Sequence, residues 1–148
     1  MPCKDTEAAG TDVLAIVQER AFANCIPVQA SLEITLQCNL RCVHCYNFDR
    51  DRPYDPAVRA SELTREEILR VMGELREAGC LYLMLTGGEA LLHPALFDFL
   101  DHAARLHMAV RILSNGAMPL PPVLDRLAAA PNLMGLSISL YGATAETH

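Results

Sequence analysis

The sequence predicts an α/β fold with a parallel sheet. Short apolar segments alternate along the chain with amphipathic segments that have helical spacing. Strands connected through helices in this order form βαβ crossovers, which make the strands parallel. The apolar segment at residues 81–86 is apolar almost throughout, as expected for a strand that is covered on both faces. We therefore expect strands that lie side by side in chain order.

The composition indicates a folded domain and excludes several classes of protein. Of 148 residues, 51% are hydrophobic and 20% are charged, which is too apolar for a disordered chain. No apolar run approaches the roughly eighteen residues of a membrane span, and the first residues lack the order of a secretion signal. A net charge of −6 without a basic cluster argues against nucleic-acid binding. We expect a cytoplasmic protein that binds neither nucleic acid nor a membrane.

The first part of the chain is expected to lead into the sheet. Residues 1–30 form an N-terminal extension that contains a short helix ending before Pro27. The first strand is expected at residues 32–36. Residues 49–53 alternate in charge and end in proline, which predicts a solvated loop.

A helix with clear end signals follows. Thr64 and Glu67 form a capping box, and Gly79 supplies the left-handed residue that ends the helix. Apolar residues at helical spacing predict its buried face: Ile68, Met72 and Leu75. The second strand then spans residues 81–86.

Two further units repeat this pattern. A helix is expected to open near Pro94, and its buried stripe consists of Leu96, Leu100, Ala103 and His107. A strand at residues 108–113 follows. A helix from about Pro122 is stopped by Pro131, and the fourth strand spans residues 133–140.

Thiols, glycines and polar side chains follow the strands. In parallel α/β folds the ligand site lies at the carboxyl ends of the strands, so the segments after the four strands are expected to converge. These segments are Cys38–Cys45, Gly87-Gly88-Glu89, Ser114-Asn115-Gly116 and Tyr141-Gly142.

Three of the six cysteines form a C-x3-C-x2-C pattern, namely Cys38, Cys42 and Cys45. Disulfide frameworks are typical of small secreted chains, whereas clustered cysteines indicate a metal site. A structural zinc ion usually takes four ligands, so a zinc site requires Cys3, Cys25 or Cys80 in addition. Three thiolates on a four-iron cluster leave one iron open to an outside ligand.

The other strand ends have both functional and purely structural interpretations. Gly87 and Gly88 permit close approach of the backbone to a ligand, and Glu89 can accept hydrogen bonds from an ammonium group. The same three residues also suit an ordinary strand-to-helix turn. Asn115 is either a rim residue of the site or part of a turn.

The C-x3-C-x2-C loop after the first strand and Gly-Gly-Glu after the second resemble the radical S-adenosylmethionine (SAM) superfamily, from about Ser31 to the end of the chain. The resemblance implies a partial TIM-like (βα)n barrel and a [4Fe-4S] cluster held by Cys38, Cys42 and Cys45. In this family SAM chelates the fourth iron through its amino and carboxylate groups. The reduced cluster cleaves SAM to methionine and a 5′-deoxyadenosyl radical, which abstracts hydrogen from a substrate.

The resemblance also implies a SAM-binding set. His44 stands where the family often has an aromatic residue near the adenine, although a solvent-facing loop histidine is the alternative. Tyr141 replaces a common aspartate in the Ser-Leu-Asp-Gly stretch, and Ala90 replaces the proline of Gly-Gly-Glu-Pro. The residues expected to bind SAM are Gly87, Gly88, Glu89, Ser139, His44 and Asn115.

The residues within the motifs are similar to those of SPASM-type members, which modify peptides or proteins. This similarity implies a peptide or small-molecule substrate, a role in peptide modification or cofactor maturation, and an electron donor such as a flavodoxin or ferredoxin. We expect four of the family's six βα strands in residues 31–148, and thus a truncated core whose last strand is an aggregation-prone edge. The alternatives are a non-enzymatic iron–sulfur or zinc-binding module and a catalytically incomplete fragment.

Overall fold

A computed structural model describes residues 13–47, 57, 61–117, 121–142 and 144. These residues form a four-stranded sheet in the order β1-β2-β3-β4, with every neighbouring pair parallel. The strands are β1 (Gln29–Thr35), β2 (Tyr82–Gly87), β3 (Ala109–Ser114) and β4 (Leu133–Ile138). The parallel α/β fold and the sequential strand order are therefore confirmed.

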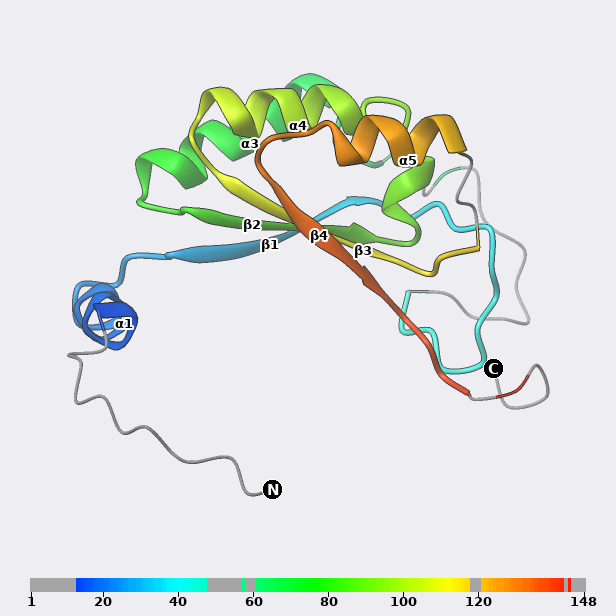
Figure 1. The fold of residues 1–148 in the computed structure, drawn as a ribbon, viewed down its shortest axis with the longest axis horizontal. Helices are drawn as coiled ribbons and strands as arrows, with labels where there is room; N and C mark the ends of the chain where they lie inside the picture. Colours follow the sequence, from blue (N-terminus) through cyan, green and yellow to red (C-terminus); the bar gives the residue numbers. More distant parts are fainter. Residues whose placement is uncertain (1–12, 48–56, 58–60, 118–120, 143, 145–148) are drawn as a thin grey trace, which may run out of the picture.

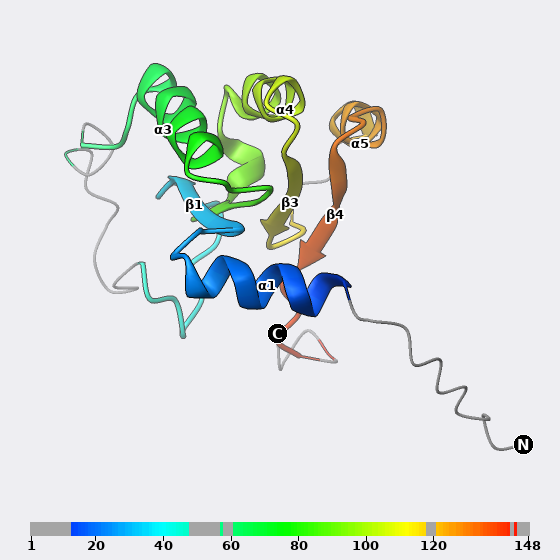
Figure 2. The ribbon, with the colours of Figure 1, turned by 90° about the vertical axis from the view of Figure 1, so that its left-hand side faces the viewer.

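Three helices cover one face of this sheet, and one helix lies on the opposite side (Figures 1 and 2). The covering helices are α3 (Arg65–Glu77), α4 (Leu96–Arg105) and α5 (Pro121–Ala128), and the opposite one is α1 (Val13–Ala23). A short 3-10 turn, η1 (Ala90–Leu92), follows β2. Within the part of the chain that the structure describes, no helix has the length and apolarity needed to cross a membrane.

The hydrophobic core lies between the sheet and the covering helices. The alternate residues Leu83 and Leu85 of β2, and Val110 and Ile112 of β3, are at most 1% exposed. They pack in one cluster with the buried faces of α3 and α4, as the two-residue period of strands and the helical period require. The helix residues of this cluster include Ile68, Met72, Leu96, Phe99, Leu100 and Ala103.

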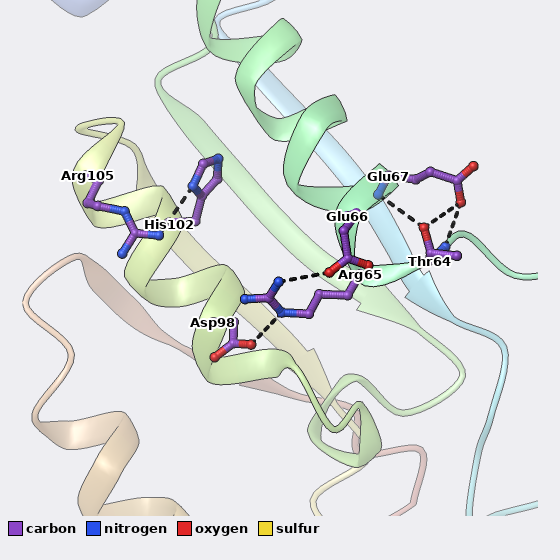
Figure 3. A network of polar contacts seen from close by, with 7 residues as sticks. All are labelled: Thr64, Arg65, Glu66, Glu67, Asp98, His102 and Arg105. Carbon is purple, nitrogen blue, oxygen red and sulfur yellow. Dashed lines mark hydrogen bonds and ion pairs between the residues drawn. The ribbon is translucent and has the colours of Figure 1, made fainter.

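The predicted capping box is present at the start of α3 (Figure 3). Thr64 Oγ1 accepts a hydrogen bond from the Glu67 backbone N–H at 3.2 Å, and the Thr64 backbone N–H donates to Glu67 Oε2 at 2.8 Å. At the first residue of α3, Arg65 Nε donates to Asp98 Oδ2 at 2.6 Å and joins α3 to α4. Because both partners are about half exposed, this ion pair contributes little stability.

The structure corrects several predicted details. The helix expected at Pro94 begins at Leu96, because η1 occupies the chain just before it. His107 is not part of a buried stripe, since α4 ends at Arg105 and His107 is exposed with φ of 55°. The fourth strand ends at Ile138 and lies at one edge of the described sheet. The predicted loop at residues 49–53 falls outside the described residues.

Candidate functional site

The segments after the four strands converge on one pocket of about 180 Å³. Every site residue predicted from the sequence lines this pocket except Glu89. The pocket therefore brings together the cysteine loop after β1, the glycine pair after β2, Asn115 after β3 and Ser139 after β4. This arrangement follows from the parallel sheet, in which all carboxyl ends meet at one rim.

The cysteine loop places all three thiol-bearing residues, Cys38, Cys42 and Cys45, on the wall of the same pocket. A turn is closed by the Cys45 N–H, which donates to the Cys42 carbonyl at 3.2 Å. Burial raises the pKa of the Cys42 thiol, and the neighbouring charges of Cys38 and Cys45 raise it further. Cationic iron at this position would offset that mutual repulsion, because metal-bound thiols are deprotonated.

The chemistry of the donor set fits an iron–sulfur cluster, because three cysteines of one short loop line the pocket. Among the described residues, no three cysteine, histidine or acidic side chains are close enough to share one metal ion. A four-iron cluster is larger than a single ion and separates its cysteine ligands more widely. Cys80 is fully buried at the amino end of β2, and Cys25 is exposed beyond α1, so neither joins this loop as a fourth ligand. Cys3 lies outside the described residues.

Two acidic residues contact the chain on either side of the cysteine loop. The Tyr46 hydroxyl donates to Glu33 Oε1 at 2.8 Å, and this hydrogen bond is the main reason that the pKa of Tyr46 is raised. Glu62 Oε1 accepts from the Thr35 hydroxyl at 3.1 Å and also from the Leu36 N–H. The sequence analysis did not predict either carboxylate, although Glu33 is the one charged residue of β1.

The glycine pair allows two backbones to lie together. The Gly88 N–H donates to the Thr35 carbonyl at 2.8 Å, and the Glu89 N–H donates to the Gln37 carbonyl at 2.7 Å. A Cβ atom on Gly87 would lie 2.0 Å from the Thr35 oxygen, and φ at Gly87 is +133°. The structure shows close approach to the segment that leads into Cys38. The predicted close approach of the glycine pair to a ligand stays a prediction.

Glu89 joins two strand ends from a buried position. The side chain is 1% exposed and caps η1, where Oε1 accepts from the Leu91 N–H at 3.0 Å. Its second oxygen, Oε2, accepts from the Asn115 N–H at 2.7 Å. Both carboxylate oxygens therefore contact backbone donors, and the predicted contact of Glu89 with a ligand ammonium group stays a prediction.

The remaining predicted residues take part in local contacts at the rim. The rings of His44 and Tyr141 lie 4.0 Å apart between centroids, with an interplanar angle of 55°. The Ser139 N–H donates to the Ser114 carbonyl at 2.9 Å, which extends the pairing of β3 and β4 beyond the strand. Tyr141 was not predicted as a site residue, and its place directly after the fourth strand is the signal that could have indicated it.

Comparison with known proteins identifies the class. The family model described as the radical SAM superfamily matches residues 32–148, and the chain belongs to this family. The cofactors of the family are a [4Fe-4S] cluster and SAM, so the predicted cofactors are confirmed.

Curated relatives support this assignment, and solved structures share the fold. The chain is 35% identical over 116 residues to the AdoMet-dependent heme synthase of Methanosarcina barkeri, covering 78% of this chain and 32% of that protein. It is 34% identical over 122 residues to the mycofactocin maturase MftC of Mycobacterium tuberculosis, and the match covers 82% of this chain and 29% of that protein. Streptococcus suis SuiB bound to the precursor peptide SuiA has a TM-score of 0.66 at 15% identity, covering 99% of this chain and 34% of that one. The chain thus spans about a third of the length of these relatives.

Proposed function

We propose that this chain forms part of a radical SAM enzyme that modifies a peptide. In this proposal residues 31–148 belong to the catalytic core and residues 1–30 are an N-terminal extension. The observation that carries the proposal is the pocket at the strand ends, where the three-cysteine loop faces the glycine pair and Ser139. The family match over residues 32–148 supports it.

In the proposed site, Cys38, Cys42 and Cys45 hold the [4Fe-4S] cluster and leave one iron without a protein ligand. When bound, the cluster and SAM would supply a 5′-deoxyadenosyl radical after one-electron reduction by a donor such as a flavodoxin or ferredoxin. The chain's own residues position the cofactors and exclude water. Glu33 ties the end of the cysteine loop to β1 through Tyr46, and Glu62 holds the end of β1 from which the loop starts.

The opposite side of the same pocket is proposed to receive SAM. The backbone at Gly87 and Gly88 lines the pocket, and Ser139 faces it from beyond β4. The His44–Tyr141 pair presents two ring faces at the pocket wall, which suits the stacking of an adenine. Glu89 acts here by holding the strand ends in place, because its carboxylate is buried against backbone donors.

The proposed substrate is a peptide. Relatives are named as the mycofactocin maturase and as the subtilosin biosynthesis protein AlbA, the latter 28% identical over 123 residues. A solved neighbour is described as SuiB bound to a precursor peptide. Cofactor maturation is the second candidate, because the relative with 35% identity is named as a heme synthase.

We place the protein in a reducing compartment such as the cytoplasm. All described cysteines are free thiols, which is the usual state of cysteines in such compartments. Free thiols are also needed for the proposed cluster, because the ligand is the thiolate.

The test is the formation of 5′-deoxyadenosine from SAM under anaerobic, strongly reducing conditions. The chain reconstituted with iron and sulfide is expected to release 5′-deoxyadenosine, and Cys42→Ala is expected to abolish the release. Cys25→Ala is the matched control, because Cys25 is exposed and lies away from the pocket. Stoichiometric zinc without iron would instead support a structural metal module and contradict the proposal.

A further inference from the structure

The side-chain amide of Asn115 lies against the first cysteine of the loop. Asn115 Nδ2 is 3.6 Å from Cys38 Sγ, within the range of N–H···S hydrogen bonds, and 2.8 Å from Asn39 Oδ1. The backbone N–H of Leu40 also donates to Cys38 Sγ, at 3.4 Å. Cys38 therefore has two N–H donors directed at its sulfur, one from its own loop and one from the end of β3.

The orientation of the Asn115 amide is determined by its other contacts. The Ala117 N–H donates to Asn115 Oδ1 at 2.8 Å, so the carbonyl end of the amide is already an acceptor. Reversing the amide would place its NH₂ group against this N–H and its oxygen against the Asn39 oxygen. The NH₂ group must therefore face Cys38 and Asn39.

The backbone around Asn115 is also fixed before any cofactor binds. The Asn115 N–H is held by Glu89 Oε2 at 2.7 Å, and the Gly116 N–H donates to Ser114 Oγ at 3.0 Å. Glu89 is itself 1% exposed and held at its other oxygen. The donor at Asn115 is thus preorganised relative to the cysteine loop.

We propose that Asn115 raises the reduction potential of the iron–sulfur cluster by donating a hydrogen bond to the Cys38 sulfur. This inference rests on the proposed function, in which Cys38 is a cluster ligand. Reduction transfers one electron from an external donor to the cluster and places additional negative charge on its thiolate ligands. A hydrogen bond to a ligand sulfur stabilises that charge, and such bonds are a known determinant of cluster potential.

The experiment is a potentiometric titration of the cluster without SAM, followed by electron paramagnetic resonance. Asn115→Ala and the similarly sized Asn115→Leu both remove the donor without adding a charge. We expect both variants to be harder to reduce than the wild-type chain. A tenfold fall in the equilibrium constant for reduction corresponds to a potential about 59 mV more negative for a one-electron couple. Asn39→Ala, which leaves the amide but removes its second partner, is expected to shift the potential less and in the same direction.

The matched control is Asn47→Ala. Asn47 lines the same pocket, but its described contacts include none to a cysteine sulfur. The reduction potential of the cluster in this variant is therefore expected to equal that of the wild type. Unchanged potentials in both Asn115 variants would overturn the inference, and weaker SAM binding with unchanged potential would assign Asn115 to SAM instead. A wild-type chain that takes up no iron would overturn the proposed function itself, which the titration distinguishes because no cluster signal would be present.

Discussion

Glu89 Oε2 accepts a hydrogen bond of 2.7 Å from the backbone N–H of Asn115, and this contact joins the carboxyl ends of β2 and β3. The second carboxylate oxygen accepts from the Leu91 N–H at 3.0 Å. A buried carboxylate is costly to desolvate unless such donors compensate it. The acidic residue of the Gly-Gly-Glu motif therefore holds the carboxyl ends of β2 and β3 together.

Replacing this carboxylate with an amide should destabilise the fold. Glu89→Gln keeps the shape but turns an NH₂ group toward one of the two backbone N–H donors, and we expect a loss of about 1–3 kcal/mol. Urea denaturation of the chain measures this loss. Glu74→Gln is the control, because Glu74 is exposed and its ion pair among the described residues is with Arg70 on the surface of α3. Its effect should stay within about 0.5 kcal/mol. Equal effects of the two substitutions would contradict the bridging role of Glu89.

A methyl group at Gly87 should disrupt the junction of β1 and β2. The added Cβ would lie 2.0 Å from the Thr35 carbonyl oxygen, at a φ of +133° that other residues rarely adopt. We therefore expect Gly87→Ala to unfold at lower urea concentration and to lose the capacity to bind iron and sulfide.

The control is the same substitution where space and conformation permit it. A Cβ on Gly73, within α3, meets nothing within 4 Å. Gly73→Ala should be neutral or stabilising by up to about 1 kcal/mol, because glycine is unfavourable inside a helix. If both alanine variants were equally stable, the close approach at Gly87 would not constrain the fold.

Acid should weaken the fold through His93. Burial lowers the pKa of His93, against a smaller opposing effect of Glu62, and its Nδ1 accepts a hydrogen bond from the Ala95 N–H at 3.1 Å. The neutral ring is thus favoured in the folded state. The corresponding stability is present above the unfolded-state pKa of about 6.5 and is lost as pH falls from there toward the lower folded-state pKa.

The free energy of unfolding measured across this pH range distinguishes the contribution of His93 from that of the other histidines. His93→Asn keeps an acceptor near Nδ1, and the fall in urea midpoint between about pH 7.5 and pH 5 should become smaller than in the wild type. His107→Asn is the matched control, because His107 is exposed and asparagine tolerates its φ of 55°. An unaltered pH profile in His93→Asn would show that another group dominates.

The capping box of α3 should contribute measurable stability. Thr64→Ala removes the acceptor for the Glu67 N–H and the hydroxyl bonded to Glu67 Oε2. A loss of about 0.5–2 kcal/mol is expected from chemical denaturation. Thr64→Ser, which keeps the hydroxyl, should recover most of it, and a serine variant as weak as the alanine variant would argue against capping as the cause.

Short sequence patterns predicted the helices and strands of the sheet domain well. The capping box and the 68/72/75 spacing identified α3, because the interactions that start a helix lie within a few residues of one another. Helix ends were less certain. The spacing from Ala103 to His107 fits a helix, but α4 ends at Arg105 because the chain turns through a left-handed residue to enter β3.

The residues of the site were predicted better than their contacts. The rule that ligands bind at strand ends placed the cysteines, the glycine pair and Asn115 around one pocket. The contacts of Glu89 and Cys38 with Asn115 join residues 26 and 77 positions apart. They depend on the register of neighbouring strands, which no local pattern in the sequence specifies.

The most direct test of the account is the iron and acid-labile sulfide content of the anaerobically reconstituted chain. We expect about four of each per chain, and almost none when Cys38, Cys42 or Cys45 is replaced by alanine. Cys25→Ala and Cys80→Ser should retain the full content, because Cys25 is exposed away from the loop and Cys80 lies in the core. A chain that binds one zinc ion and no iron, or that keeps its iron without the three cysteines, would contradict the assignment of this pocket as a radical SAM site.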